Sequence, residues 1–448
     1  MAENIERSLA ELYAQDAERA DAVVFGRRPK VNRRGFLNGA GLAAMAVGVG
    51  GAIPFADDMP AGLIPVAMAQ SAPPPSPTES APKTLEFPGK EKGLAVLGER
   101  PLVAETPEHL LDDDTTPIGK FFIRNNGQIP ADTGAPDAWK FAVDGEVNNP
   151  LELTLGDLKQ RFPDRTFRMV MECGGNGRSF FSPTARGNQW TNGGVGCAEW
   201  TGVALADVLK AAGLKPSAKF TGHYGADPHL SGDPSKESLS RGMPIEKAME
   251  EHGLIVWSMN GAALPNIHGG PVRLLIPGWP GSLSSKWLKR VWVRDREHDG
   301  QGMGGTSYRV AIVPMVPGGK ADDKNFRILE SMPVRSIISN PANGTRLPAG
   351  TRDLPLRGAA WAGDLSVQRV DISIDYGATW MAADMAATKN RYDWNRWSAN
   401  VRLPSDGYFE LWARATDSQG RMQPHVAGNW NPQGYGANPL HRVAVLVG

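Results

Sequence analysis

One cysteine stands where metal chemistry could occur. Cys173 ends the apolar run that begins at Met169, and the chain then passes through Gly-Gly-Asn-Gly to Arg178. A strand that ends in a cysteine with a glycine-rich exit places the sulfur at a cleft mouth, with room for a bulky ligand. A thiolate there suits a soft, high-valent metal. From the residues alone, two alternatives stay open: a hydrolase-type nucleophile, which needs a histidine base, and a buried, inert cysteine.

Basic and hydroxyl side chains recur beside glycine-rich turns. His268 and Arg273 flank a Gly-Gly-Pro turn, and Ser284, Ser285 and Lys286 follow a second turn of this kind. Donors spaced in this way can hold a phosphate group. Each of them alone is more often a solvated surface charge, so the prediction of an anion site depends on their occurring together.

The segments that must position these side chains are short and are separated by Gly/Pro turns. Residues 205–212 and 244–251 have the apolar spacing of helices, whereas residues 272–276 and 290–293 are typical of strands. We therefore expect an α+β domain over residues 95–325.

The pattern changes over residues 326–448. Polar and apolar residues alternate in the segments 367–375, 397–403 and 408–415, and turns follow every few residues. Alternation of period two with frequent turns predicts an immunoglobulin-like β-sandwich.

Composition restricts the function classes. Lys+Arg and Asp+Glu both number 48 among the 448 residues, so the formal charge is zero and a nucleic-acid partner is not expected. Two cysteines, Cys173 and Cys197, are too few for a cysteine-ligated iron–sulfur cluster, and the sequence has no Cys-x-x-Cys-His haem attachment site. A disulfide between them is one alternative, but we favour a core role for Cys197.

The N-terminal segment has the features of a twin-arginine (Tat) export signal. Arg33 and Arg34 precede a Gly/Ala-rich apolar run, and the segment 67–69 offers an Ala-x-Ala cleavage site. A membrane anchor is the alternative, which the many glycines disfavour. We expect a signal peptide over residues 1–69, a Pro/Ser-rich linker over residues 70–94, and a mature periplasmic chain without a membrane span.

Four motifs together resemble one family. Cys-x-Gly-Asn-x-Arg at Cys173, Phe-Phe-x-Arg-Asn at Phe121, His-Gly-x-Pro-x-Arg at His268 and Lys-Trp-Leu-x-Arg-Val at Lys286 are similar to motifs of sulfite oxidases and plant-type nitrate reductases, in the same order. The resemblance extends from about Ala95 to the C-terminus. It implies a molybdenum–molybdopterin cofactor, and it implies that the sandwich is a dimerisation domain.

The resemblance also implies roles for individual residues. Cys173 would be the thiolate ligand of molybdenum, and Arg124 and Arg178 would form an anion pocket beside the metal. Tyr308 would be the active-site tyrosine. The residues that would bind the cofactor are Phe122, Ile123, Arg124, Asn125, Asn126, His268, Arg273, Ser284, Ser285 and Lys286.

One departure from the family bears on the substrate. Near the C-terminus, Gln433 stands where animal members present a third pocket arginine. One fewer positive charge weakens a pocket for a free dianion such as sulfite. A pocket with one fewer positive charge fits a less charged or protein-bound sulfur better. This agrees with a closer resemblance of the sequence to molybdenum subunits of the sulfane dehydrogenase type.

That resemblance implies partners as well as a reaction. We expect persulfide-type sulfur on a carrier protein's cysteine as substrate, a c-type cytochrome subunit as electron acceptor, and a dimer of this chain within a hetero-oligomer. Direct sulfite dehydrogenation is the alternative in the same class. A reductase of the methionine-sulfoxide type would lack the sandwich, and a non-catalytic scaffold would have no need of Cys173.

Overall fold

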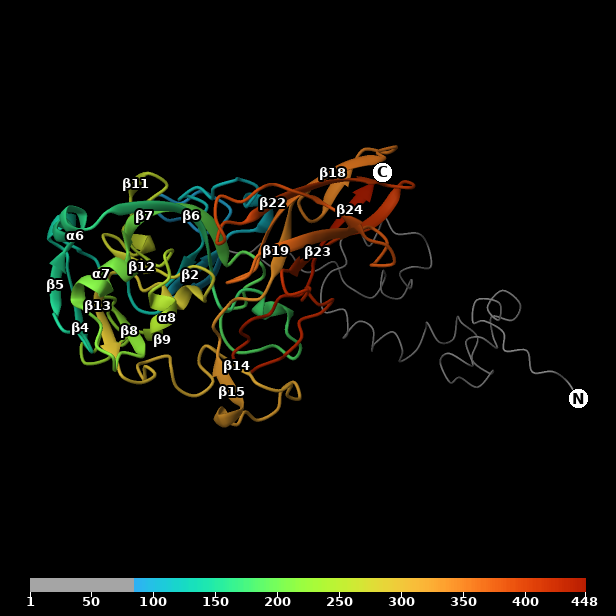
Figure 1. Ribbon diagram of the computed structural model, residues 1–448. Helices are drawn as coiled ribbons and strands as arrows, with labels where there is room; N and C mark the ends of the chain where they lie inside the picture. The colour runs from blue at the N-terminus through green and yellow to red at the C-terminus, as the bar shows by residue number, and fades with distance from the viewer. Residues whose placement is uncertain (1–83) are drawn as a thin grey trace, which may run out of the picture. The chain divides into compact units, whose positions relative to one another are not determined.

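Strands dominate the part of the chain that the computed structural model describes, residues 84–448 (Figure 1). The predicted signal peptide, residues 1–69, lies outside the described residues, as does most of the predicted linker. Within residues 84–448, no helix is both long and apolar enough to cross a membrane.

Three sheets build the region before residue 325. One has the order β5-β4-β13-β8-β9, the second the order β11-β10-β7-β6 with β12 on β10, and the third the order β1-β2-β3. All their pairings are antiparallel except β4 with β13. Their strands are β1 (Ala95–Glu99), β2 (Leu102–Glu105), β3 (Ile123–Arg124), β4 (Lys140–Gly145), β5 (Leu151–Thr154), β6 (Asp164–Glu172), β7 (Val195–Ala204), β8 (Phe220–Gly225), β9 (Ser240–Pro244), β10 (Leu254–Met259), β11 (Ala262–Ala263), β12 (Arg273–Leu275) and β13 (Leu288–Arg294).

The three α-helices of the described chain are short and pack on these sheets. They are α6 (Leu155–Arg161), α7 (Leu205–Ala212) and α8 (Ile245–Ala248). A capping box between Thr154 and Asp157 starts α6. The predicted helix at residues 205–212 is confirmed, and its apolar face enters the main core. The predicted helix at residues 244–251 is confirmed only as the single turn α8.

The C-terminal region is a β-sandwich, as the alternating pattern predicts. One sheet has the order β16-β18-β22-β21 and the other the order β17-β24-β23-β19-β20, and their inner faces share one hydrophobic core. In β22 the residues alternate between buried and exposed from Trp397 onward. A hairpin of β14 (Arg309–Ala311) and β15 (Phe326–Ile328) precedes the sandwich. Its strands are β16 (Arg335–Asn340), β17 (Thr345–Leu347), β18 (Asp353–Trp361), β19 (Val367–Ser373), β20 (Met381–Ala382), β21 (Asp384–Met385), β22 (Asn395–Arg402), β23 (Gly407–Asp417) and β24 (His441–Val447).

The end of the predicted linker is packed rather than free. Leu85 and Leu94 are buried with Ile123 in a small core, and Thr84 bridges Ala95. The linker expectation therefore needs correction over residues 84–94, because these two leucines supply apolar surface that the Pro/Ser-rich segment before them lacks.

Candidate active site

Strand β6 delivers Cys173 to the wall of a cavity. The strand pairs with β7 along its whole length, and its last residues are buried. The amide of Cys173 donates a hydrogen bond to Gly194 O (2.8 Å), and the amide of Asn176 donates one back to Cys173 O (2.9 Å). These two bonds fix the turn that follows the strand. Gly177 has φ +81° there, which favours glycine, and a Cβ would meet Ala437 O.

The cavity gathers most of the predicted site residues from five separate segments. Its volume is about 760 Å³, including space open to solvent. Residues that sequence analysis named and that line it are Phe122, Arg124, Asn125, Asn126, Cys173, His268, Arg273, Ser284, Ser285, Lys286 and Tyr308. Ile123 and Arg178 are the two named residues that do not line it.

Two loops bring the cations of the cavity together. Gly269 has φ +96°, and a Cβ at this position would meet the side chain of Lys286 at 2.6 Å, so the loops approach closely only because residue 269 is glycine. Lys286 Nζ donates to Asn125 Oδ1 (2.7 Å) and Ile267 O (2.6 Å). Arg273 braces both loops by donating to His268 O (2.8 Å) and Ser284 O (2.7 Å).

These cations lack ordinary counter-ions. Neither Arg273 nor Lys286 forms an ion pair within residues 84–448. Burial lowers the pKa of Arg273 to about 9, and burial together with Arg273 holds the pKa of Lys286 well below its usual range. Buried charge without a partner is costly, so the site is built for an anion that it binds.

Sequence analysis missed Lys90, which approaches the same cavity from the packed N-terminal segment. Its Nζ lies 2.6 Å from His268 Nε2 and donates to Ile118 O and Phe121 O. Burial lowers the pKa of Lys90 to about 7. No sequence pattern indicated a site role for Lys90, because this residue lies in the segment that the composition predicted to be a linker.

Two polar lining residues, Asp227 and Ser282, were also missed. Asp227 follows β8, and its carboxylate accepts a hydrogen bond from the amide of Gly127 (3.1 Å), while burial raises its pKa. The hydroxyl of Ser282 is buried without a hydrogen-bond partner. A ligand in the cavity can therefore find a carboxylate acceptor and a free hydroxyl there, in addition to the cations.

Tyr308 is held in a strained backbone conformation at the cavity wall. Its φ is +49°, which is rare for a bulky residue and often marks a functional position. Its hydroxyl lies 3.5 Å from Asn126 Oδ1, and its ring stacks on Tyr435 with 4.8 Å between centroids. Tyr435 comes from the segment before β24, and sequence analysis did not single it out.

Arg178 and Ile123 lie behind the cavity wall. Arg178 begins a 3₁₀ turn and donates to Gln433 O (2.7 Å) and Asn188 O (2.8 Å), with its guanidinium 5.2 Å from the Tyr435 ring. Ile123 is fully buried in a small apolar core. Gln433 therefore holds Arg178 through its backbone, while its neutral side chain lies 3.5 Å from Thr306 Oγ1.

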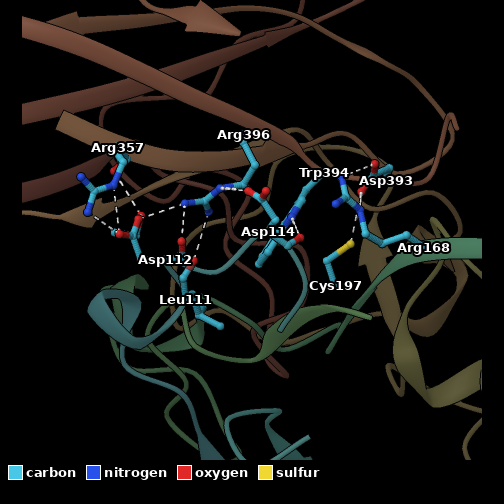
Figure 2. A network of polar contacts seen from close by, with 10 residues as sticks. Leu111, Asp112, Asp114, Arg168, Cys197, Arg357, Asp393, Trp394 and Arg396 are labelled. Atoms are coloured by element: carbon cyan, nitrogen blue, oxygen red, sulfur yellow. Dashed lines mark hydrogen bonds and ion pairs between the residues drawn. The ribbon is translucent and has the colours of Figure 1, made fainter. Parts of the chain in front are cut away.

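Residues of the sandwich form hydrogen bonds with β6, the strand that leads to Cys173. Asp393 accepts two hydrogen bonds from Arg168 of β6 (2.8 and 2.7 Å) (Figure 2). Tyr392 O accepts one from the amide of Val170 (2.8 Å). Glu172, next to Cys173, accepts a hydrogen bond from Trp361 Nε1 (2.7 Å). The position of the strand that leads to Cys173 thus depends on both regions of the chain.

Cys197 belongs to this network and not to the cavity. It is fully buried, and its Sγ lies 3.4 Å from Asp393 Oδ1 (Figure 2). Burial and the Asp393 carboxylate raise the pKa of Cys197, so the thiol stays protonated and acts as a donor. Both cysteines are free, so the disulfide alternative is not realised.

The donor set fits a molybdenum–pterin cofactor. Cys173 offers one sulfur, the cations with Ser282 suit a phosphate, and Asp227 can accept hydrogen bonds from the ring N–H groups of a pterin. Within residues 84–448, no three His, Cys, Asp or Glu side chains group as a metal site. A dithiolene cofactor would supply further sulfur ligands for a metal beside Cys173.

Comparison with known proteins defines the class. Residues 126–302 match the family model described as the oxidoreductase molybdopterin binding domain, and residues 327–448 match the Mo-co oxidoreductase dimerisation domain. The chain is accordingly a molybdopterin oxidoreductase.

The family follows from relatives that align over most of both chains. Sulfite oxidase from Gallus gallus is 33% identical over 79% of this chain and 78% of its own length. Mitochondrial sulfite oxidase from Homo sapiens is 32% identical over 82% of this chain and 68% of its own. The crystal structure of the sulfane dehydrogenase SoxCD from Paracoccus pantotrophus superposes with a TM-score of 0.65 at 26% identity, over 88% of this chain and 95% of that chain. This chain belongs to the sulfite oxidase family, and it is a molybdenum-dependent enzyme that oxidises a sulfur group.

Proposed function

We propose that this enzyme is a periplasmic sulfane dehydrogenase that oxidises persulfide-type sulfur on the cysteine of a carrier protein. The proposal rests on one residue, Gln433. By the resemblance described above, it stands where animal members of the family have a pocket arginine, and its neutral side chain contacts Thr306. A pocket with one fewer cation favours a monoanionic, protein-bound sulfur over a free dianion. The similarity to the SoxCD structure supports the same choice.

The residue roles follow from their places around the cavity. Cys173 would hold the molybdenum, and Lys286, His268 and Arg273 with the neighbouring serines would hold the cofactor phosphate, since all of them line the cavity. Arg124 lies at the cavity wall and is part-buried, with its guanidinium donating to Asn125 O. We assign Arg124 the orientation of the anionic sulfur group, with Arg178 supporting the same wall from behind.

The bound cofactor supplies oxygen transfer to sulfur and accepts two electrons. Each such step adds one water-derived oxygen to the sulfur and releases two electrons and two protons. The hydroxyl of Tyr308 lies on the cavity wall near Asn126, where it can hydrogen-bond the substrate and relay a proton. We propose that a c-type cytochrome subunit receives the electrons one at a time.

Location and assembly complete the proposal. We assign export to the twin-arginine segment around Arg33 and Arg34, and dimer formation within a hetero-oligomer to residues 326–448 after a catalytic domain of residues 95–325. The match of residues 327–448 to a dimerisation domain supports the second assignment.

Substrate competition tests the proposal. Purified holoenzyme is given free sulfite or a carrier protein with a cysteine persulfide, and cytochrome c reduction is followed at equal sulfur concentrations. We expect kcat/KM for the carrier-bound sulfur to exceed that for sulfite by at least tenfold. A ratio that favours sulfite would replace the proposal with direct sulfite dehydrogenation, which is the alternative for the same cavity.

A further inference from the structure

Arg241 is a buried cation that the mechanism above leaves unused. It lies on β9 and has no solvent exposure. One of its nitrogens, Nη1, donates to Gly302 O (2.7 Å) and contacts Met303 Sδ (3.0 Å), while Nε and Nη2 have no hydrogen-bond partner. A buried guanidinium with two unsatisfied nitrogens lowers stability, so its presence calls for a role other than folding.

The guanidinium stacks on the active-site tyrosine. Arg241 Cζ lies 4.6 Å from the centroid of the Tyr308 ring, which stacks on Tyr435 with 21° between the ring planes. The guanidinium of Arg178 lies 5.2 Å from the Tyr435 ring. Four side chains from four distant segments thus form a column in the order Arg241, Tyr308, Tyr435 and Arg178, with a cation at each end.

The surroundings of Arg241 do not neutralise its charge. Burial is the largest cause of the low pKa values of His223, about 3, and His298, about 4, so both rings are neutral at physiological pH. The carboxylate that acts on Arg241 through space is Glu297, which is largely exposed and already paired with Arg309 (2.7 Å). The positive field of Arg241 therefore reaches the cavity through the Tyr308 ring.

We propose that Arg241 is a positioning residue that acts through Tyr308 and adds a positive field from behind its ring, while the pocket still lacks the direct cation that an arginine in place of Gln433 would provide. It holds the strained tyrosine in place from behind, and its charge favours an anionic sulfur group at the cavity wall where Tyr308 lies. The inference rests on the proposed anion pocket and adds a residue that the resemblance to known relatives does not name.

Sulfate binding tests this role without turnover. Sulfate is an unreactive oxyanion, and its affinity for the as-purified holoenzyme is measured by titration calorimetry at low ionic strength. We expect Arg241→Met to weaken sulfate binding by at least tenfold, because a unit charge at this range acts in a poorly screened site. Arg241→Lys, which keeps the charge, should stay within about threefold of wild type.

A matched control removes a neighbouring arginine whose charge is already paired. Arg309→Met loses the partner of Glu297 and should change sulfate affinity by less than about twofold. Steady-state kinetics with sulfite give a second readout. Arg241→Met should raise KM by a similar factor while kcat falls less, as expected for lost anion binding.

Thermal stability separates the proposed role from a structural one. Since Arg241 is buried without a counter-ion, Arg241→Met should unfold at the same temperature as wild type or higher. An unfolded or strongly destabilised Arg241→Met protein would contradict the proposal, as would unchanged sulfate affinity in that variant. If the wild-type holoenzyme binds no sulfate, the proposed anion pocket is overturned. If the wild type binds sulfate and Arg241→Met binds it equally well, only the proposed role of Arg241 is overturned.

Discussion

The chemistry of this enzyme depends on a few side chains whose charges are not balanced by the protein. Arg273 and Lys286 form no salt bridge within residues 84–448, although the Asp227 carboxylate attracts Lys286 through space, and Lys90 lies against the ring of His268. The cost of burying these cations is offset only when an anion binds among them. We propose that the cofactor phosphate is the anion that balances the positive charge of this cavity.

The charge of Lys286 can be tested directly. Replacing Lys286 with glutamine keeps a donor for Asn125 Oδ1 but removes the charge. We expect the pterin content of the purified protein to fall about tenfold, since a charge-assisted contact to phosphate contributes on the order of 1.5–3 kcal/mol. Pterin released by denaturation is quantified by fluorescence.

The control for this variant is Lys289→Gln, three residues away on β13, where the lysine is exposed over Trp139. Its pterin content should equal that of wild type. Equal pterin in both variants would show that Lys286 does not bind the cofactor.

Sequence motifs predicted the lining of the cavity well but not the residues behind it. Local sequence patterns mark three of the lining residues, Cys173, His268 and Lys286, each of which lies near glycines. Such patterns can be recognised in the sequence alone. Arg241 and Tyr435 have no such pattern. Their roles arise from stacking on Tyr308, which lies 67 and 127 residues away along the chain, and only the tertiary structure reveals these contacts.

Strand β6 is the element on which the site depends most. Its inner end presents Cys173, and its middle is bound by the loop of the sandwich that contains Tyr392 and Asp393. The strand pairing of β6 was not predicted, because the sequence shows only an apolar run and gives no register. The alternating strands of the sandwich were predicted, because each has one solvated face.

Breaking the Arg168–Asp393 pair should loosen this strand. Asp393 has no exposed side-chain surface, and Asp393→Asn leaves Arg168 largely buried with one charge unpaired. We expect a loss of about 3 kcal/mol in the free energy of unfolding, measured by chemical denaturation.

Arg357→Gln breaks the exposed pair with Asp112 in the same network and should cost under about 1 kcal/mol (Figure 2). Equal losses in the two variants would contradict the view that the buried pair is the stronger support of β6.

Glu105 gives the stability of the folded protein a dependence on pH. Glu105, at the end of β2, accepts a hydrogen bond from the amide of Thr191 (2.8 Å), in the segment that backs Cys173. Burial raises its pKa to about 7. Because the folded pKa lies above the unfolded value, the folded state holds the proton more tightly, and this contribution to stability is lost as the pH rises through 7.

The Glu105→Gln variant does not lose this stability as the pH rises, because its side chain is neutral at every pH. The variant should gain stability relative to wild type between pH 5 and pH 8.5, by about 2–3 kcal/mol, with the difference vanishing near pH 4.5. Calorimetric unfolding at several pH values measures the difference. Parallel stability curves for the two proteins would show that Glu105 does not titrate near neutrality.

Residues 84–448 combine a cofactor domain and a sandwich that are bound to each other through β6, the strand that leads to Cys173. Composition alone indicated a formal charge of zero and too few cysteines for a cysteine-ligated iron–sulfur cluster. The packing of Leu85 and Leu94 with Ile123 was not predicted, because the two leucines are too isolated to form a pattern. The sandwich thus holds β6, the strand that leads to Cys173, besides any part in assembly.

Molybdenum content tests the central assignment most directly. Wild-type protein and Cys173→Ser are purified from a host that makes the cofactor, and metal and activity are measured on both. We predict near-stoichiometric molybdenum in wild type, and in Cys173→Ser a loss of sulfur-oxidising activity, since the thiolate ligand is gone while the phosphate-binding cations remain. Wild-type protein without molybdenum, or a fully active Cys173→Ser variant, would contradict the assignment of Cys173 as the metal ligand.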